Sequence, residues 1–234
     1  MSASSPADAD DALERELRAR FEVVDAPVRV VGAEVPLLRP RSADDLISEA
    51  DFVRDERLPY WADVWPSSLA LAAHVGAMHG THRTLLELGC GVGLVAIHAL
   101  RAGFGVLATD YYDDALRFAE LNARRVLGRP LATRHLDWRA LPADLPRFDV
   151  VIASDVLYEP AYGEVVAEVF ARTLAPRGEG WIADPGRVAS GLFVDECGRR
   201  GIQIERAKKV SHADGDIRQT ITLYRLWLPS RRRG

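Results

Sequence analysis

The chain has 234 residues, of which 48% are hydrophobic and 27% are charged, and its formal net charge is −4 at pH 7. This balance is typical of a globular protein and excludes a disordered chain, which combines low hydrophobicity with high charge. The length favours one domain with an added segment, and the two cysteines, Cys90 and Cys197, lack the spacing of a disulfide framework or a zinc site.

The start of the chain and its apolar runs bear on localisation. Met1 to Asp11 are small, polar and acidic, without the basic start and apolar run of a signal peptide. No run approaches the roughly 18 apolar residues of a membrane span. We therefore expect a cytoplasmic protein in a reducing compartment, with no membrane partner.

Charge is distributed unevenly along the chain. Residues 1–60 hold 14 acidic and 8 basic residues, whereas the remainder is close to neutral. Neither part has the dense basic patch of a nucleic-acid surface, so no nucleic-acid partner is expected. The basic run Arg231 to Arg233 predicts a solubilising tail over residues 229–234. The acidic first part could attract a basic partner surface or cover an active site.

The first 58 residues predict an extension outside the main domain. The apolar spacing over Ala9–Arg20 predicts an amphipathic helix, and the β-branched residues around Gly32 predict a hairpin. Ser42 is expected to cap a helix that runs to Asp51. Pro66 then predicts the first turn of a further helix that runs to about His79, because proline is tolerated there.

Beyond this helix, short apolar runs alternate with longer amphipathic segments, which predicts an α/β domain over residues 59–228. Strands are expected at 84–88, 105–109, 131–136, 148–154 and 180–184, and helices at 92–102, 113–127, 160–174 and 187–200. Two further strand-like stretches, 202–210 and 217–228, flank the turn-forming Ala213-Asp214-Gly215. The domain is therefore expected to close with an antiparallel hairpin.

The strongest local signal is ELGCGVG, Glu87 to Gly93, between an expected strand and an expected helix. Glycines there allow a tight turn and let a ligand approach the backbone N–H groups at the helix start. Leu94 stands where a dinucleotide fingerprint has its third glycine, which disfavours NAD. Asp110 ends the next strand and can accept both hydroxyls of an adenosine ribose; the alternative is that it caps the following helix. This order of elements predicts an adenosine-containing ligand.

ELGCGVG together with Asp110 resembles the first two cofactor motifs of the Rossmann-like S-adenosylmethionine-dependent methyltransferases. The closing hairpin matches the reversed last strand of that fold. The resemblance implies a three-layer sheet of order 3-2-1-4-5-7-6 with the last strand antiparallel. It also implies S-adenosylmethionine as cofactor, S-adenosylhomocysteine as product, and no metal.

Three further motifs are similar to those of the seven-β-strand protein-lysine methyltransferases. They are PYWADVWPSS at 59–68, HLDW at 135–138 and SDVLY at 154–158. That branch carries a D-x-x-Y or D-x-x-F element, matched here by Asp155 and Tyr158. The resemblance implies N-methylation of a lysine side chain in a protein substrate.

The same resemblance assigns residues to the parts of the cofactor. The methionine end is expected at Glu87, Gly89 and Gly91, and the small Cys90 is expected beside it. The ribose is expected at Asp110, and the adenine at Tyr111, Asp137 and Trp138. The remaining contacts are expected from the ring of Trp65 and the backbone of Ser154. Core packing is the alternative role for both tryptophans, although a flat purine or a sulfonium is attracted to an aromatic face.

Asp155 follows a strand that is expected to be fully buried, so its carboxylate should lie at the upper edge of the sheet. There it could orient an amine nucleophile, stabilise the developing ammonium or assist its deprotonation. Tyr158 could add a hydrogen bond or an aromatic contact. The alternatives are that Asp155 caps the next helix and that Tyr158 packs beneath it.

The sequence leaves other functions open. A small-molecule N- or O-methyltransferase, acting on nicotinamide or another metabolite, would meet the cofactor through the same loops. An enclosed pocket would favour that reading, and an open acidic groove would favour a protein substrate. A non-catalytic cofactor-binding protein also has these motifs. A nucleic-acid methyltransferase is disfavoured, because SDVLY stands where an N-P-P-Y-type element would receive a flipped base.

Overall fold

The structure is a computed structural model that describes residues 6–43, 46, 59–214 and 217–229. The helix expected from Ser42 to Asp51 lies for the most part outside these residues. So does the expected basic tail, apart from its first residue. No helix in the described ranges is long and apolar enough to cross a membrane.

A mixed seven-stranded sheet forms the centre of the molecule, in the order β5-β4-β3-β6-β7-β9-β8. Its strands are β3 (Thr84–Leu88), β4 (Gly105–Asp110), β5 (Ala132–His135), β6 (Phe148–Ser154), β7 (Leu174–Asp184), β8 (Gln203–Asp214) and β9 (Ile217–Trp227). The first five are parallel, whereas β9 runs antiparallel to both β7 and β8. When the domain strands β3 to β9 are counted from 1 to 7, this order reads 3-2-1-4-5-7-6. The predicted order and the reversed last strand are therefore confirmed.

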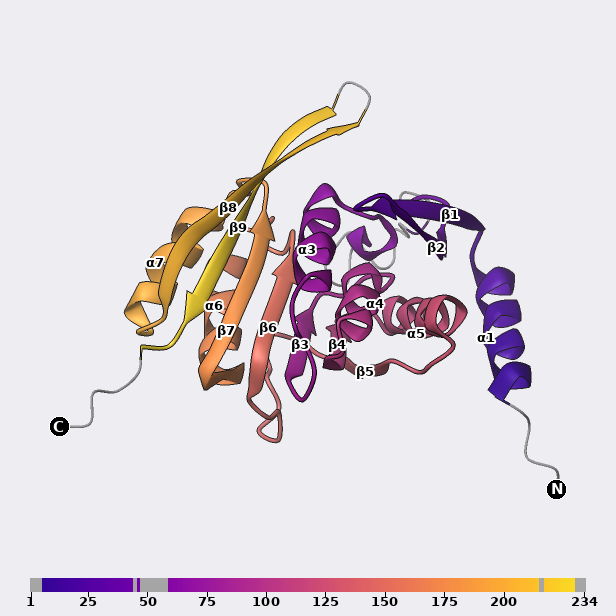
Figure 1. The fold of residues 1–234 in the computed structure, drawn as a ribbon, viewed down its shortest axis with the longest axis horizontal. Coiled ribbons are helices and arrows are strands. Elements are labelled where there is room, and N and C mark those ends of the chain that lie inside the picture. The colour runs from indigo at the N-terminus through magenta and orange to yellow at the C-terminus, as the bar shows by residue number, and fades with distance from the viewer. Residues whose placement is uncertain (1–5, 44–45, 47–58, 215–216, 230–234) are drawn as a thin grey trace.

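Helices cover both faces of the sheet (Figure 1). One layer contains α3 (Pro66–Gly76), α4 (Leu94–Arg101) and α5 (Asp113–Leu127), and the other contains α6 (Tyr162–Thr173) and α7 (Ser190–Arg199). Successive strand residues face opposite layers, so Leu85 packs with the first and Leu86 with the second. Because both faces are buried, the central strands are continuous apolar runs.

The structure differs from the expected boundaries at α3, β7 and β8. The helix ends at Gly76, because tighter turn-type hydrogen bonds from Ala77 N and Met78 N replace the helical pattern. Strand β7 begins at Leu174, opposite Phe148, and the register shifts before the regular pairing resumes at Glu179. The proline, arginine and glycine between these two points hid the start of the strand from the sequence pattern. Strand β8 continues to Asp214, so Ala213 and Asp214, which were expected in the turn, pair with Arg218 and Ile217 of β9.

An N-terminal segment, residues 6–43, lies against the α5 side of the domain (Figure 1). It contains α1 (Pro6–Arg20) and a separate hairpin of β1 (Val23–Val30) and β2 (Ala33–Pro40). Val31 and Gly32 form the hairpin turn, and both have positive φ, as a two-residue turn with the twist of its strands requires.

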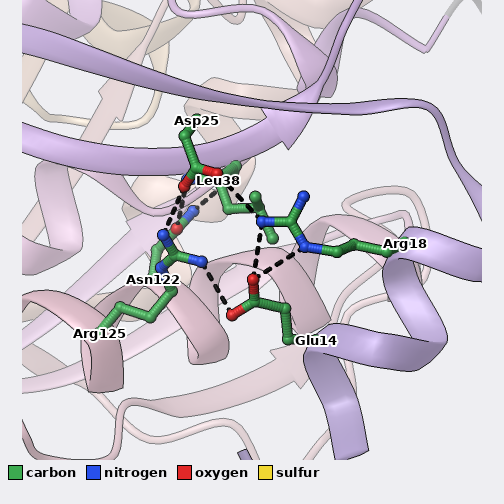
Figure 2. Close-up of polar contacts among 6 residues, drawn as sticks. All are labelled: Glu14, Arg18, Asp25, Leu38, Asn122 and Arg125. Atoms are coloured by element: carbon green, nitrogen blue, oxygen red, sulfur yellow. Dashed lines mark hydrogen bonds and ion pairs between the residues drawn. The ribbon is translucent and has the colours of Figure 1, made fainter. Parts of the chain in front are cut away.

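Ion pairs attach this segment to α5. Arg125 of α5 binds Glu14 of α1 at 2.8 Å and Asp25 of β1 at 2.5 Å, and Arg18 contacts the same two carboxylates (Figure 2). Further pairs with α5 are Arg20 with Asp114, Arg117 with Glu16, and Arg124 with Asp10.

These pairs change the interpretation of the acidic first part of the chain. Six of its described carboxylates form ion pairs with arginines of the same chain: Asp10, Glu14, Glu16, Glu22, Asp25 and Glu34. The negative charge of these carboxylates is therefore largely neutralised by arginines of the same chain, and the expectation that they attract a basic partner does not hold for them.

Arg125→Gln removes both ion pairs that this arginine makes with the N-terminal segment. We expect the free energy of unfolding to fall by about 1 kcal/mol at low salt, because each such pair is worth up to about 1 kcal/mol. The loss should shrink in about 1 M NaCl, where the Debye length is about 3 Å. Urea unfolding measures both values. Arg29→Gln, which breaks an exposed pair with Glu34, is the matched control; a loss that salt leaves unchanged would contradict an electrostatic origin.

Candidate functional site

A pocket opens at the carboxyl ends of β3, β4 and β6, where open α/β sheets bind their ligands. Its volume is about 980 Å³, including the space open to solvent. The structure brings every predicted site residue to its wall: Trp65, Glu87, Gly89, Cys90, Gly91, Asp110, Tyr111, Asp137, Trp138, Ser154, Asp155 and Tyr158.

The glycine loop between β3 and α4 is tightly enclosed. Gly91 has a φ of +51°, and a Cβ at this position would lie 2.9 Å from the carbonyl oxygen of Trp61. Gly93 has a φ of +90°, and its Cβ would lie 2.9 Å from Ala119 of α5. Glycine is therefore required at both positions for conformation and for space.

Asp110 joins the end of β4 to this loop. Its Oδ2 accepts a hydrogen bond from the N–H of Gly91 at 2.9 Å, and its Oδ1 accepts one from the N–H of Tyr112 at 3.1 Å. No side chain caps α5, whose N-cap residue is Tyr112, so Asp110 is not the helix cap. Burial raises the pKa of Asp110, and the backbone hydrogen bonds oppose this rise.

Glu87 is a second buried carboxyl group in the same pocket, and it is only 2% exposed. Burial raises its pKa well above the ordinary value, and the negative charge of Asp110 adds to the rise. Its Oε2 has no hydrogen-bond partner among the described residues. Two neighbouring carboxyl groups, one with an unused acceptor, fit a cationic ligand such as S-adenosylmethionine, which carries a sulfonium and an ammonium group.

Aromatic rings form a continuous wall of the pocket. Tyr60 packs edge-on against Trp65 at 5.8 Å and against Tyr158 at 5.3 Å, and Tyr162 packs against Tyr158 at 5.2 Å and Trp138 at 5.6 Å. The indole Nε1 of Trp138 is buried without a hydrogen-bond partner in the described part of the chain. Both tryptophans line the cavity, and Trp138 also packs against the core beneath α6 and α7. Tyr60 and Tyr162 were not predicted as site residues.

The expected adenine end contains a pair that the sequence did not predict. Asp137 binds Arg139, with its two carboxylate oxygens 3.0 Å from Nε and 2.8 Å from a terminal nitrogen of the guanidinium. The guanidinium lies over the ring of Tyr111 at 6.0 Å. The carboxylate of Asp137 thus holds Arg139, which itself lines the pocket.

Cys90 is buried within the glycine loop. Its burial raises the pKa of the thiol well above the ordinary value, and the nearby carboxylates add to the rise. Because the thiolate is the nucleophilic form, this buried thiol is poorly suited to act as a nucleophile.

Asp155 is held on both carboxylate oxygens. Ser67 Oγ donates to Oδ2 at 2.9 Å, and Arg187 Nε donates to Oδ1 at 2.5 Å. The Arg187 guanidinium also lies over the ring of Trp65 at 5.4 Å. The φ of Asp155 is +58°, a strained conformation for a residue with a side chain and one that is enriched at functional sites. Helix α6 begins at Tyr162 without a side-chain cap, so Asp155 does not cap it.

Tyr158 and Ser154 lie on either side of Asp155 along the chain. The pKa of Tyr158 is raised by burial and by the neighbouring Tyr162, so its hydroxyl stays protonated and can donate a hydrogen bond. Ser154 ends β6 at the pocket. In the described residues, no group of three or more histidine, cysteine or acidic side chains is arranged to hold a metal ion.

The sheet order, the glycine loop and the acid at the end of β4 together define the class of domain. The fold is that of the Rossmann-like, class I S-adenosylmethionine-dependent methyltransferases. Residues 86–179 match the family model of a methyltransferase domain, which spans the loop and the ends of β3, β4 and β6.

The curated relatives that this chain resembles are named either as lysine methyltransferases or as arginine methyltransferases. The protein-lysine methyltransferase METTL21E of Mus musculus is 32% identical over 126 residues, which cover 47% of this chain and 50% of the relative. The histone-arginine methyltransferase METTL23 of Homo sapiens is 29% identical over 121 residues, which cover 46% of this chain and 60% of the relative. The chain spans about half the length of the curated relatives it matches.

Solved structures share the fold. The magnesium protoporphyrin IX methyltransferase ChlM from Synechocystis PCC 6803, crystallised with bound S-adenosylmethionine, has a TM-score of 0.55 at 18% identity. The match covers 78% of this chain and 94% of that chain. At this identity the likeness concerns the architecture of the domain.

Glu87→Gln removes an ionisable group whose pKa is raised by folding. Such a group contributes stability below its ordinary pKa of 4.5, and this contribution is lost as the pH rises through the raised value. We therefore expect the variant to match the wild type near about pH 4 and to have the higher Tm at about pH 8. Thermal unfolding across this range measures the difference, and a variant less stable than the wild type at the higher pH would contradict the prediction.

Proposed function

We propose that the protein is an S-adenosylmethionine-dependent N-methyltransferase that methylates a lysine side chain of a protein. The observation that carries this proposal is the position of Asp155 and Tyr158 in one pocket with the carboxyl groups of Glu87 and Asp110. A cationic cofactor fits the paired carboxyl groups, and a nitrogen nucleophile fits the held carboxylate and the protonated phenol. The similarity to METTL21E supports lysine as the acceptor.

The chain offers a set of groups for each part of the cofactor. Glu87 and the backbone of Gly89 and Gly91 would hold the methionine end, and Asp110 the ribose. Tyr111 and Trp138 would enclose the adenine, with Asp137 holding Arg139 at the rim. Trp65 and the backbone of Ser154 complete the wall beside Asp155.

When bound, S-adenosylmethionine would supply a methyl group to the lone pair of the neutral amine nitrogen, while the carbon–sulfur bond breaks with its electron pair left on sulfur, so that the products are a methylated ammonium ion and a neutral thioether. The chain has to align the nitrogen and exclude water, and such alignment contributes on the order of 7–11 kcal/mol to lowering a barrier. Asp155 would accept an N–H of the neutral amine and so direct its lone pair. Tyr158 would hold the amine from the aromatic wall.

Arg187 and Ser67 serve this step by fixing Asp155. Their hydrogen bonds leave the carboxylate in one orientation. The guanidinium also neutralises the charge of Asp155, so the pair has no net attraction for an ammonium ion. This arrangement favours entry of the amine in its neutral form, which is the form with a free lone pair.

Transfer of labelled methyl groups to a host-cell lysate tests the proposed substrate class. The purified full chain is incubated with methyl-labelled S-adenosylmethionine and lysate, and the labelled proteins are hydrolysed to amino acids. We expect a discrete labelled protein that yields methyl-lysine. Methyl-arginine would place the chain with the histone-arginine relative, whereas label confined to small molecules would replace the protein substrate by a metabolite.

Asp155→Ala separates methyl transfer from cofactor binding. We expect the rate of transfer to fall by about 10²-fold or more, because the group that directs the amine is lost. The dissociation constant for S-adenosylhomocysteine should stay within about twofold of the wild-type value, since the groups proposed to hold it are intact. Titration calorimetry and the labelling assay measure the two quantities.

Asp144→Ala is the matched control, because it also removes an aspartate paired with an arginine, in this case the exposed pair with Arg134. It should leave both quantities unchanged. Undiminished transfer by Asp155→Ala would remove this residue from the mechanism.

A further inference from the structure

Asn122 lies in the middle of α5 and has no exposed surface. Its Oδ1 accepts a hydrogen bond from the N–H of Leu38 in β2 at 2.8 Å, and its Nδ2 donates to the carbonyl of Leu38 at 2.9 Å (Figure 2). The same Nδ2 donates to the carbonyl of Val92 in the glycine loop at 3.0 Å. One buried amide therefore joins the N-terminal hairpin to the loop beneath the cofactor pocket.

The loop needs such support because of its glycines. Gly89, Gly91 and Gly93 all have positive φ, and Val92 lies between the last two. Glycine loses more backbone freedom on ordering than any other residue, so a loop rich in glycine is costly to fix in one conformation. Hydrogen bonds from outside the loop lower that cost before a ligand arrives, which is preorganisation.

A second path runs from the N-terminal segment to the same loop through aromatic rings. Phe21, just after α1, packs edge-on against Trp61 at 6.3 Å and contacts Phe118 of α5 at 5.7 Å. The carbonyl oxygen of Trp61 in turn lies against Gly91. The ion pairs of Arg125 hold the hairpin and α1 on α5, so both paths depend on the docked segment.

We propose that the β1–β2 hairpin braces the glycine loop in its ligand-binding conformation, and that Asn122 is the positioning residue that couples the two. None of the described residues of the N-terminal segment lines the pocket. The hairpin therefore influences the ligand through the loop, without touching it. This inference rests on the proposed function in one respect, that S-adenosylhomocysteine is a ligand of the pocket.

Coupling of this kind is reciprocal, and reciprocity supplies the test. If an ordered hairpin favours ligand binding, then ligand binding must stabilise the hairpin by the same free energy. Hydrogen–deuterium exchange of the full chain, with and without saturating S-adenosylhomocysteine, measures this directly. We expect the ligand to slow exchange in the peptide that covers residues 33–40, as well as in the peptide that covers residues 105–112 at the pocket.

Asn122→Ala cuts the proposed link, and Val169→Ala is its matched control. Val169 is fully buried in α6, in the layer on the other face of the sheet, so its truncation lowers stability away from the loop. We expect Asn122→Ala to weaken S-adenosylhomocysteine binding by about tenfold, within the usual range of coupling. In this variant the ligand should still protect residues 105–112 but no longer residues 33–40. Val169→Ala should retain both protections and bind within about twofold of the wild type.

The outcomes separate the two proposals. Wild-type protein that binds the ligand without any change in exchange at 33–40 would overturn the coupling and leave the proposed function standing. Equal weakening of binding by Asn122→Ala and Val169→Ala would reduce Asn122 to an ordinary core residue and also overturn it. Failure of the wild type to bind S-adenosylhomocysteine would overturn the proposed function, and this inference with it.

Discussion

The pocket depends on the hydrogen bond from the N–H of Gly91 to the carboxylate of Asp110. This bond ties the loop after β3 to the end of β4, and it holds the backbone in a left-handed turn that leaves no room for a side chain. The floor of the pocket is therefore made of backbone, pressed between Trp61 on one side and α5 on the other. The residues at the ends of β3 and β4 take their positions relative to this turn.

Several features of the site are unfavourable for folding in isolation. Glu87 is buried beside another acid, and Asp155 adopts a backbone conformation that side chains disfavour. Such features persist only where the surrounding structure determines them, and they concentrate where a protein binds or transforms a ligand. Here the surroundings are two well-packed helical layers and a docked N-terminal segment, and the positive charge of the proposed cofactor would relieve part of the strain.

Sequence reasoning predicted those parts of the fold that have a local pattern. The buried strands are continuous apolar runs, and ELGCGVG stands between a strand and a helix, so the alternation of elements and the position of the pocket followed from these patterns. The sheet order followed from the resemblance to the S-adenosylmethionine-dependent methyltransferases. The partners of Asp155 were missed, because Ser67 and Arg187 lie 88 and 32 residues away in the chain. Ser67 belongs to the motif PYWADVWPSS, but nothing in that motif marks its hydroxyl as a partner of Asp155. A weak signal for Arg187 was available: it follows a proline and a glycine directly after β7, where a loop reaches the same edge of the sheet.

The N-terminal segment shows the same limit. Its helix and hairpin were predictable from periodicity and from the turn at Gly32, but the function of its charges was not. The net charge of a segment does not indicate which arginines pair with its carboxylates. Arg125, for example, is 111 residues from its partner Glu14. The contact of Asn122 with Leu38 spans 84 residues and uses backbone groups, which no side-chain pattern marks. Interactions of this kind become visible only when the chain is folded.

Helix α5 carries two sets of contacts on different sides. Ala119 faces the glycine loop, and Asn122 binds both that loop and Leu38 of the hairpin. Arg117, Arg124 and Arg125 bind the N-terminal segment. Each added residue turns a helix by about 100°, so an insertion between Asn122 and Arg124 would leave the loop contacts in place and rotate two of the three arginines out of reach of their partners. The spacing of residues within this helix is thus fixed by its contacts with the loop and with the N-terminal segment. Insertions or deletions should be tolerated at its ends and in the surface loops, but not within the helix.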